Sequence, residues 1–256
     1  MSKKIKIIDN IYRKTPIVNS LQIEAEKTKR AAHIGQNSGI FYVPRILRIS
    51  EKDNIIDFEY IANLCTLQHL VVSGNPQLTD ILIRTGEALA VIHKELILPG
   101  NMKKNLPDIW IRNEADNVFI HGDFTLHNVC FHKTTNSIVI LDWSTARFID
   151  AEATFGSRYF DIIWFIYHIF HFFPMSNILK WNADKMANAF LRGYIKKNNC
   201  LHKDRFKYYQ LELEKIKRPK FLLEAQTQPI YTRGLYFLLW LWKRYRYNRY
   251  KPLEVF

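Results

Sequence analysis

The chain has 256 residues, of which 48% are hydrophobic and 24% charged, a composition typical of a folded globular protein rather than a disordered or repetitive one. Its three cysteines are far apart and form no Cys-x-x-Cys pair, so neither a disulfide framework nor a zinc site is expected. The expected compartment is the reducing cytoplasm. The basic first residues lack a following apolar segment, so no secretory signal is expected.

The formal net charge of +13 is unevenly distributed. Residues 180–256 carry 18 Lys and Arg against six Asp and Glu. A basic region of this size favours something negative nearby, which would be an acidic substrate, a nucleic acid or an anionic membrane surface. The plain alternative is a solvated basic surface.

The first 62 residues predict a small lobe rich in β-strands. Short β-like segments at residues 4–8 and 11–14 flank a turn at Asp9 and Asn10. A helix is expected from Ser20 to His33, where apolar residues recur at helical spacing behind a Ser that can act as its N-cap. Two more strands follow, at residues 42–49 and 54–61.

Helical patterns dominate residues 63–256. A long amphipathic helix is expected over residues 78–96, starting at a Thr79 or Asp80 cap. Three short β-like segments follow at residues 117–124, 128–132 and 137–143, and helices fill the aromatic-rich remainder. The polar hairpin at residues 119–148 is the irregular element between apolar segments, so the chemistry is expected there.

The hairpin brings together side chains that suit a metal. With a turn centred on Thr135, opposing residue numbers sum to 270, which places Asn128 opposite Asp142. Opposing Cβ atoms in such a pair lie about 4.5 to 5.5 Å apart, so an amide oxygen and a carboxylate would face one point. A site with few oxygen ligands and room for phosphate and water suits Mg²⁺.

A third acid precedes this pair. Asp123 lies five residues before Asn128, in a loop where a carboxylate can accept a hydroxyl proton or orient a nucleophile. The order His-x-Asp, Asn, hairpin and Asp matches the phosphotransfer arrangement of kinases.

The motifs HGDFTLHN (121–128) and ILDW (140–143) resemble those of the aminoglycoside phosphotransferase and choline kinase family. GEALAVIH (86–93), FDIIWF (160–165) and FYVPRIL (41–47) also fit this family's plan, so the resemblance extends over roughly residues 11–200. It implies an α+β, two-lobed, protein-kinase-like fold. Residues 1–62 would form a shortened N-terminal nucleotide-binding lobe, and residues 63–256 a mainly helical lobe.

The resemblance also implies roles for the hairpin residues. Asp123 would be the catalytic base, and Asn128 and Asp142 would be the magnesium ligands. His121 and Asp161 would support the catalytic loop.

On the nucleotide side, the resemblance makes Lys14 the best candidate for the ATP-binding lysine, with Lys6 as a weaker one. Its partner carboxylate would be Glu24 or Glu26, which residue spacing does not decide. The hinge that offers backbone groups to adenine would comprise Glu59, Tyr60 and Ile61. Only 13 residues precede Lys14, too few for a phosphate-covering loop of the usual length.

The resemblance therefore predicts a Mg²⁺-dependent phosphotransferase that uses ATP, or GTP, and phosphorylates a hydroxyl of a small molecule or glycan. The basic C-terminal region would repel polycationic aminoglycosides and favours an anionic or membrane-attached acceptor, such as a sugar of a lipid-linked glycan. The alternative is a catalytically inactive kinase-like binding or regulatory module.

Residues 234–251 join an apolar run to a basic aromatic one. Such a helix either belongs to the core, with its last turns in solvent, or lies on an anionic membrane surface. The second interpretation would make the protein peripheral at the inner face of a membrane. No nucleic-acid reader motif accompanies the segment, so no specific nucleic acid is expected.

Overall fold

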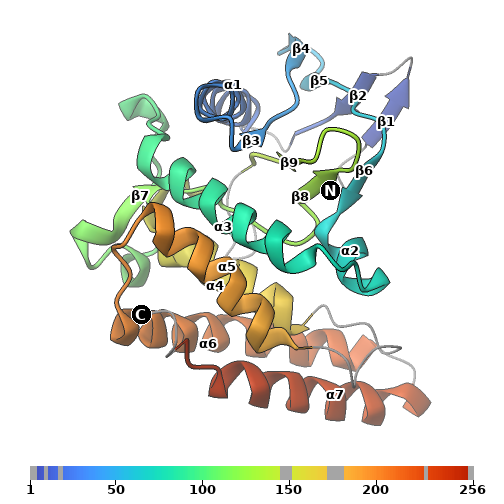
Figure 1. Cartoon of the computed structure of the whole chain (residues 1–256), viewed down its shortest axis with the longest axis vertical. Helices are drawn as coiled ribbons and strands as arrows, with labels where there is room; N and C mark the ends of the chain where they lie inside the picture. The colour runs from blue at the N-terminus through green and yellow to red at the C-terminus, as the bar shows by residue number, and fades with distance from the viewer. Residues whose placement is uncertain are drawn as a thin grey trace.

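The computed structural model describes residues 5–8, 11–16, 20–144, 152–171, 182–227 and 230–252. Strands and one helix of the N-terminal part lie at the top of Figure 1, above a larger and mainly helical part. This arrangement confirms the expected α+β, kinase-like fold class.

The N-terminal sheet consists of four antiparallel strands in the order β1-β2-β5-β4. Their bounds are Ile5–Ile8 (β1), Ile11–Lys14 (β2), Ile46–Ser50 (β4) and Ile55–Glu59 (β5). The expected pairing of the first two strands is confirmed, while Asp9 and Asn10 lie outside the described residues. A small apolar cluster attaches helix α1 (Leu21–Ser38) to this sheet.

Helix α1 is longer than the sequence predicts. It begins after Ser20, whose side chain makes no capping hydrogen bond, and it continues past His33 to Ser38. Gly39 ends it in the left-handed conformation, with φ of 65°. A glycine at this position adopts that conformation without the steric cost of a Cβ.

The second four-stranded sheet carries the hairpin, in the order β3-β9-β8-β6. Its strands are Phe41–Tyr42 (β3), Leu64–Thr66 (β6), Val129–His132 (β8) and Ser137–Ile140 (β9). Strand β3 pairs in parallel with β9, so the segment that follows α1 joins the hairpin's own sheet. Strand β7 (Asn117–Phe119) pairs instead with β10 (Phe155–Ser157).

The predicted register of the hairpin is wrong by one residue. Val129 lies opposite Ile140 and Cys130 opposite Val139, so opposing numbers sum to 269. The reason is a connection of four residues, 133–136, in which Asn136 takes a left-handed φ of 52°. Asparagine tolerates this conformation, which lets an even-numbered loop close the hairpin.

The helical lobe contains six described α-helices and three short 3₁₀ segments. The α-helices are α2 (Leu67–Ser73), α3 (Leu78–Glu95), α4 (Tyr159–His171), α5 (Ala183–Lys197), α6 (Lys203–Thr227) and α7 (Ile230–Arg249). The 3₁₀ segments are Gly100–Met102, Asp108–Trp110 and Glu114–Asp116. The residue before α3 is Gln77, so the predicted cap at Thr79 or Asp80 is wrong, although Asp80 still lies in the first turn.

Helices α3 and α5 pack closely because both carry a glycine where they cross. A Cβ on Gly193 would collide with the backbone of Ile83, and one on Gly86 with the backbone of Phe190. This crossing places His93, at the end of α3, against α4 and α5.

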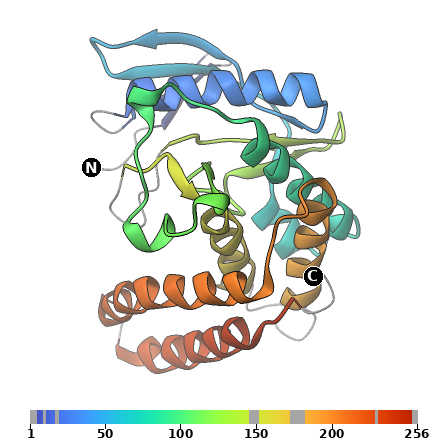
Figure 2. The same cartoon turned by 90° about the vertical axis from the view of Figure 1, so that its left-hand side faces the viewer.

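Helices α6 and α7 lie side by side at the foot of the molecule (Figures 1 and 2). The end of α7 is buried at Tyr247 and Tyr250, whereas Leu235, Leu238 and Tyr245 are exposed. The last turns of α7 therefore emerge into solvent on one side only, at Tyr245 and Arg249, while Tyr247 faces the interior. None of the helices in the described ranges has the length and apolar character that a membrane span requires.

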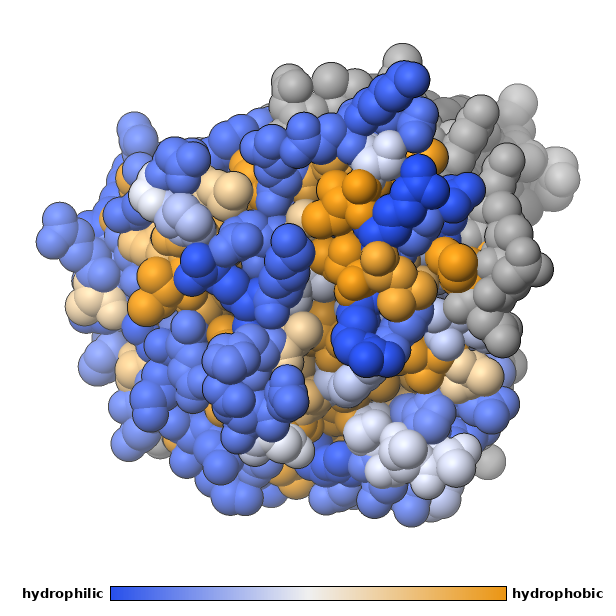
Figure 3. Space-filling model, turned by 90° about the horizontal axis from the view of Figure 1, so that it is seen from above, coloured by the Kyte–Doolittle hydropathy of each residue, from blue (hydrophilic) through white to orange (hydrophobic). Residues whose placement is uncertain are grey.

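The surface of the N-terminal side is mainly hydrophilic, with apolar patches between the polar side chains (Figure 3). A single large apolar cluster fills the helical lobe and extends under the hairpin. The hairpin thus rests on this cluster, and Asp142, just after it, contacts Lys14 of the N-terminal sheet.

Candidate active site

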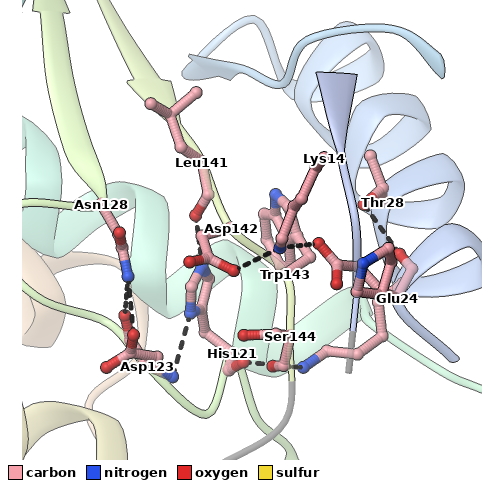
Figure 4. Close-up of polar contacts among 12 residues, drawn as sticks. Lys14, Glu24, Thr28, His121, Asp123, Asn128, Leu141, Asp142, Trp143 and Ser144 are labelled. Atoms are coloured by element: carbon pink, nitrogen blue, oxygen red, sulfur yellow. Dashed lines mark hydrogen bonds and ion pairs between the residues drawn. The ribbon is translucent and has the colours of Figure 1, made fainter. Parts of the chain in front are cut away.

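Lys14 connects the two halves of the site. It ends strand β2, is 2% exposed, and its ammonium forms ion pairs with Glu24 of α1 and with Asp142, at 2.7 Å from the latter (Figure 4). Glu26 pairs instead with Arg30 on the surface of the same helix. Of the two carboxylates that the sequence left open, Glu24 is therefore the one that contacts Lys14.

The charge of Lys14 is maintained by its neighbours. Burial alone would lower the pKa of the ammonium, but Asp142 and Glu24 outweigh burial and raise it. Lys14 is thus charged at neutral pH, at the end of strand β2.

The backbone at Asp142 explains how its side chain reaches Lys14. Strand β9 ends at Ile140, and Asp142 has a left-handed φ of 58°. In the observed register Asn128 lies beside Leu141, whose N–H donates to the Asn128 carbonyl at 2.8 Å, so Asn128 and Asp142 are not a cross-strand pair. The turn at Asp142 nevertheless directs its carboxylate between Lys14 and the pair Asp123 and Asn128 (Figure 4).

Asp123 is held from two sides. The Asn128 amide donates to its side chain at 2.9 Å and to its carbonyl at 2.8 Å. The indole N–H of Trp164, on α4, donates to the other carboxylate oxygen at 3.1 Å. These bonds fix the direction of a half-buried carboxylate.

His121 links the loop of Asp123 to the segment of Asp142. Its ring accepts the Asp123 N–H at Nδ1 and donates from Nε2 to the Leu141 carbonyl, at 3.2 Å in both cases. Burial lowers the pKa of His121 to about 4, so the ring is the neutral tautomer that this pattern needs.

Asp161 anchors the same loop from α4. Its carboxylate accepts the N–H groups of His121 and Gly122 at 2.7 and 2.9 Å. It also accepts from His93 at 3.0 Å, while the other nitrogen of that ring bonds the Tyr194 hydroxyl. Burial would raise the pKa of Asp161, but these donors lower it, so the carboxylate stays charged.

A cavity of about 290 Å³ opens beside Lys14 and Asp142. The predicted hinge residues Glu59, Tyr60 and Ile61 line it. The Glu59 carboxylate is occupied by Arg45 and Tyr42, so the hinge would present its backbone rather than this side chain. Apolar walls come from Val43, Phe58, Leu64, Ile140 and Leu141.

The donor set fits a hard divalent cation. Asn128 offers an amide oxygen and Asp142 a carboxylate, which are the groups that Mg²⁺ prefers. In the described part of the chain, no group of three or more His, Cys, Asp or Glu side chains could hold a metal. A cation here would thus need phosphate and water oxygens to complete its shell.

Two site residues were missed by the sequence reasoning, Trp164 and Lys27. Trp164 follows Asp161 by three residues, so helical spacing would have placed it on the same face toward Asp123. Lys27 follows Glu24 by three residues and bonds the carbonyls of His121 and Ser144. A buried lysine carries no sequence signal of its own.

The two parts of the fold, with a cavity beside the paired Lys14, Glu24 and Asp142 and with Asp123 and Asn128 next to Asp142, define a kinase-like fold. Residues 98–205 match the model of the phosphotransferase enzyme family, APH. Together with similar solved structures, this match confirms the resemblance to the aminoglycoside phosphotransferase and choline kinase family. No curated protein sequence matches the chain significantly.

Three similar solved structures share the fold at low identity. A glucosamine kinase in complex with glucosamine, ADP and inorganic phosphate has a TM-score of 0.58 at 12% identity, over 95% of this chain and 81% of that one. A choline/ethanolamine kinase family protein from Mesorhizobium loti has a TM-score of 0.53 at 16% identity, over 92% and 82%. An aminoglycoside-3'-phosphotransferase of type VIII has 0.52 at 12%, over 82% and 92%.

Proposed function

We propose that this protein is a Mg²⁺-dependent phosphotransferase that moves the γ-phosphoryl group of ATP, or of GTP, to a hydroxyl of a small molecule or glycan. The observation that carries the proposal is the placement of Lys14, Glu24 and Asp142 beside the cavity, with Asp123 and Asn128 next to Asp142 (Figure 4). Catalysis by such a group is mostly positioning and electrostatics.

Nucleotide binding would use the cavity. Its apolar walls suit a flat base, and the backbone of residues 59–61, which line the cavity, would supply hydrogen-bonding groups to that base. Lys14 would lie against phosphate oxygens, since its charge is fixed by two carboxylates. Asn128 and Asp142 would hold Mg²⁺, which when bound neutralises charge on the phosphates.

Asp123 would align the acceptor hydroxyl and take its proton. As the acceptor oxygen bonds to phosphorus, the bond from phosphorus to the leaving diphosphate oxygen breaks, and the proton ends on Asp123. Asn128 and Trp164 would keep the carboxylate pointed toward the acceptor, because each donates to one of its two oxygens.

The acceptor is proposed to be anionic. The Lys217 ammonium lies 4.5 Å from the ring centroid of Trp164, the indole that also bonds Asp123. Lys243 reaches the other end of α4 and donates to the His171 carbonyl at 2.7 Å. Two lysines along α4 would repel a polycation and attract a carboxylate or phosphate on the acceptor.

We also propose that the acceptor is attached to a membrane and that helix α7 binds this membrane. Helix α7 exposes Leu235, Leu238, Trp242 and Tyr245, and the Arg246 and Arg249 guanidinium groups lie over the Trp242 and Tyr245 rings. Exposed aromatic residues beside arginines suit an anionic lipid surface. Residues 234–251 would then hold the protein at the inner face of a membrane, within reach of a lipid-linked glycan.

The experiment measures transfer from radiolabelled ATP, with Mg²⁺, to two series of alcohols, each with an anionic, a neutral and a cationic member. The first series is glucuronate, glucose and glucosamine, and the second is glycerate, glycerol and ethanolamine. The wild type is expected to phosphorylate the anionic member of a series best, and Asp123→Ala to lose at least about a hundredfold in kcat. Asp108→Ala, which changes an exposed acid outside the site, is the control and should match the wild type.

The competing function is an inactive binding module. Whether or not Mg-ATP raises its melting temperature, such a module predicts the same background hydrolysis for the wild type and Asp123→Ala. That result would reject the enzyme, whereas transfer to cationic alcohols only would reject the anionic acceptor and keep the phosphotransferase.

A further inference from the structure

Lys27 is a completely buried lysine in the middle of helix α1. It lies one helical turn after Glu24, and so on the same side of the helix as the carboxylate that pairs with Lys14. It does not line the nucleotide cavity.

The Lys27 ammonium makes two hydrogen bonds to the backbone of distant segments. It donates to the carbonyl of His121 at 2.7 Å and to the carbonyl of Ser144 at 3.0 Å. His121 precedes Asp123 by two residues, and Ser144 follows Asp142 by two. Both carbonyl-bearing residues lie side by side below Asp142 in Figure 4.

Burying an ammonium group removes it from water and carries a large desolvation cost. Here burial lowers the pKa of Lys27 to about 8, although the carboxylates of Asp161, Glu24 and Asp142 favour its charged form. Two backbone carbonyls could be satisfied by neutral donors at less cost. Unlike a neutral donor, the Lys27 ammonium also offsets the negative charge of Glu24, Asp142 and Asp161, which lie near it.

The segment that Lys27 holds has an unfavourable backbone. Asp142 occupies the left-handed region, which is less favourable than the helical or extended regions for a residue with a side chain. His121 bonds one side of this turn, at the Leu141 carbonyl, and Lys27 bonds the other side, at Ser144.

We propose that Lys27 is a positioning residue that fixes the loop of Asp123 and the segment of Asp142 at a set separation and ties both to α1. The inference rests on the proposed phosphotransfer. Through Lys27, the positions of Asp123 and Asp142 are coupled to α1 and so to the ion pair of Lys14 and Glu24. Lys27 touches neither nucleotide nor acceptor, and it acts through the backbone of its two partners.

The test replaces Lys27 by Met, which keeps the length of the side chain and removes the donor. Lys27→Met is expected to lower kcat by at least about tenfold and to change the KM for Mg-ATP by less than about threefold, because Lys27 is not in the cavity wall. Lys27→Gln keeps an N–H donor group on a side chain one bond shorter, and should recover part of the loss. Thr85→Val, which removes a buried hydroxyl bonded to the Ile81 carbonyl, is the control for lost stability.

A second readout does not need turnover. Amide hydrogen exchange at residues 121–128 and 141–144 should be faster in Lys27→Met than in wild type, and unchanged in Thr85→Val. A purely structural lysine would instead lower Tm with kcat per folded molecule and these exchange rates unchanged, and that result overturns the proposal. If the wild type transfers no phosphate, the proposed function fails, and the exchange rates alone decide the role of Lys27.

Discussion

At the scale of single residues, the site depends on one ammonium between two carboxylates. Without Lys14, the carboxylates of Glu24 and Asp142 would repel each other, and the phosphates would lose their fixed cation. We expect Lys14→Met to raise the KM for Mg-ATP by more than about tenfold, a loss of about 1.4 kcal/mol in binding.

Steady-state kinetics with ATP as the varied substrate measures this change. Lys104→Met, which breaks only a surface ion pair with Glu152, serves as the matched control. An unchanged KM in Lys14→Met would show that the lysine is a core cation without a role toward nucleotide.

Trp164 gives a second prediction at this scale. Its indole N–H bonds one oxygen of Asp123, and Phe is a smaller aromatic residue that lacks this donor. Because a hydrogen bond to a charged group contributes about 1.5 to 3 kcal/mol, Trp164→Phe should lower kcat by roughly ten- to a hundredfold and leave the KM for ATP unchanged. Single-turnover rates with saturating Mg-ATP measure the effect, and an equal loss in kcat and ATP affinity would speak against it.

At the scale of elements, the crossing of α3 and α5 determines where His93 and Asp161 lie. A methyl group on Gly193 would meet the Ile83 backbone, which cannot move without displacing α3. Gly193→Ala should therefore destabilise the protein by more than about 2 kcal/mol. Urea unfolding measures this, with Gly100→Ala as control because a Cβ there meets nothing within 4 Å; equal stability of the two variants would refute the argument.

The elements also show what the sequence could predict. The two strands around Asp9, the α1 helix and the hairpin follow from local pattern, because periodicity and turn residues report neighbours along the chain. The register of the hairpin does not follow, since a four-residue loop and a five-residue loop look alike until Asn136 adopts its left-handed conformation.

The candidate site was predictable in part for the same reason. Asp123, Asn128 and Asp142 stand in one motif, whereas the choice of Glu24 over Glu26 depends on which face of α1 meets the sheet. The bonds of Lys27 join segments far apart in sequence, so they required the tertiary structure. Helical spacing could have placed Trp164 on the same face as Asp161, and only its bond to Asp123 required the fold.

At the scale of the whole molecule, buried histidines couple stability to pH. Burial lowers the pKa of four histidines, which are His93, His121, His168 and His171. The pKa falls to about 4 at His121 and to about 3 at His171. Below the unfolded value of about 6.5, the unfolded chain binds protons that the folded chain refuses, so the free energy of unfolding decreases as pH falls.

We expect this free energy to change little between about pH 7 and 7.5 and to fall between pH 6.5 and 5, by at most about 1.4 kcal/mol per pH unit for each histidine. Urea unfolding at pH 7.5, 6 and 5 measures the slope. His171→Gln should make it shallower, and His33→Gln, on the exposed side of α1, should not. A stability that is flat from pH 7.5 to 5 would contradict the burial of these rings.

The most direct measurement is binding of Mn²⁺, as a magnetic substitute for Mg²⁺, in the presence of a non-hydrolysable ATP analogue. Electron paramagnetic resonance counts the bound ion in wild type, Asn128→Ala and Asp142→Asn. If Asn128 and Asp142 hold the cation beside the phosphates, Asn128→Ala and Asp142→Asn should each weaken Mn²⁺ binding by at least about tenfold. The control variant Asp108→Ala should bind Mn²⁺ as the wild type does. Equal Mn²⁺ affinity in all four proteins, or nucleotide binding without any ion, would contradict the account.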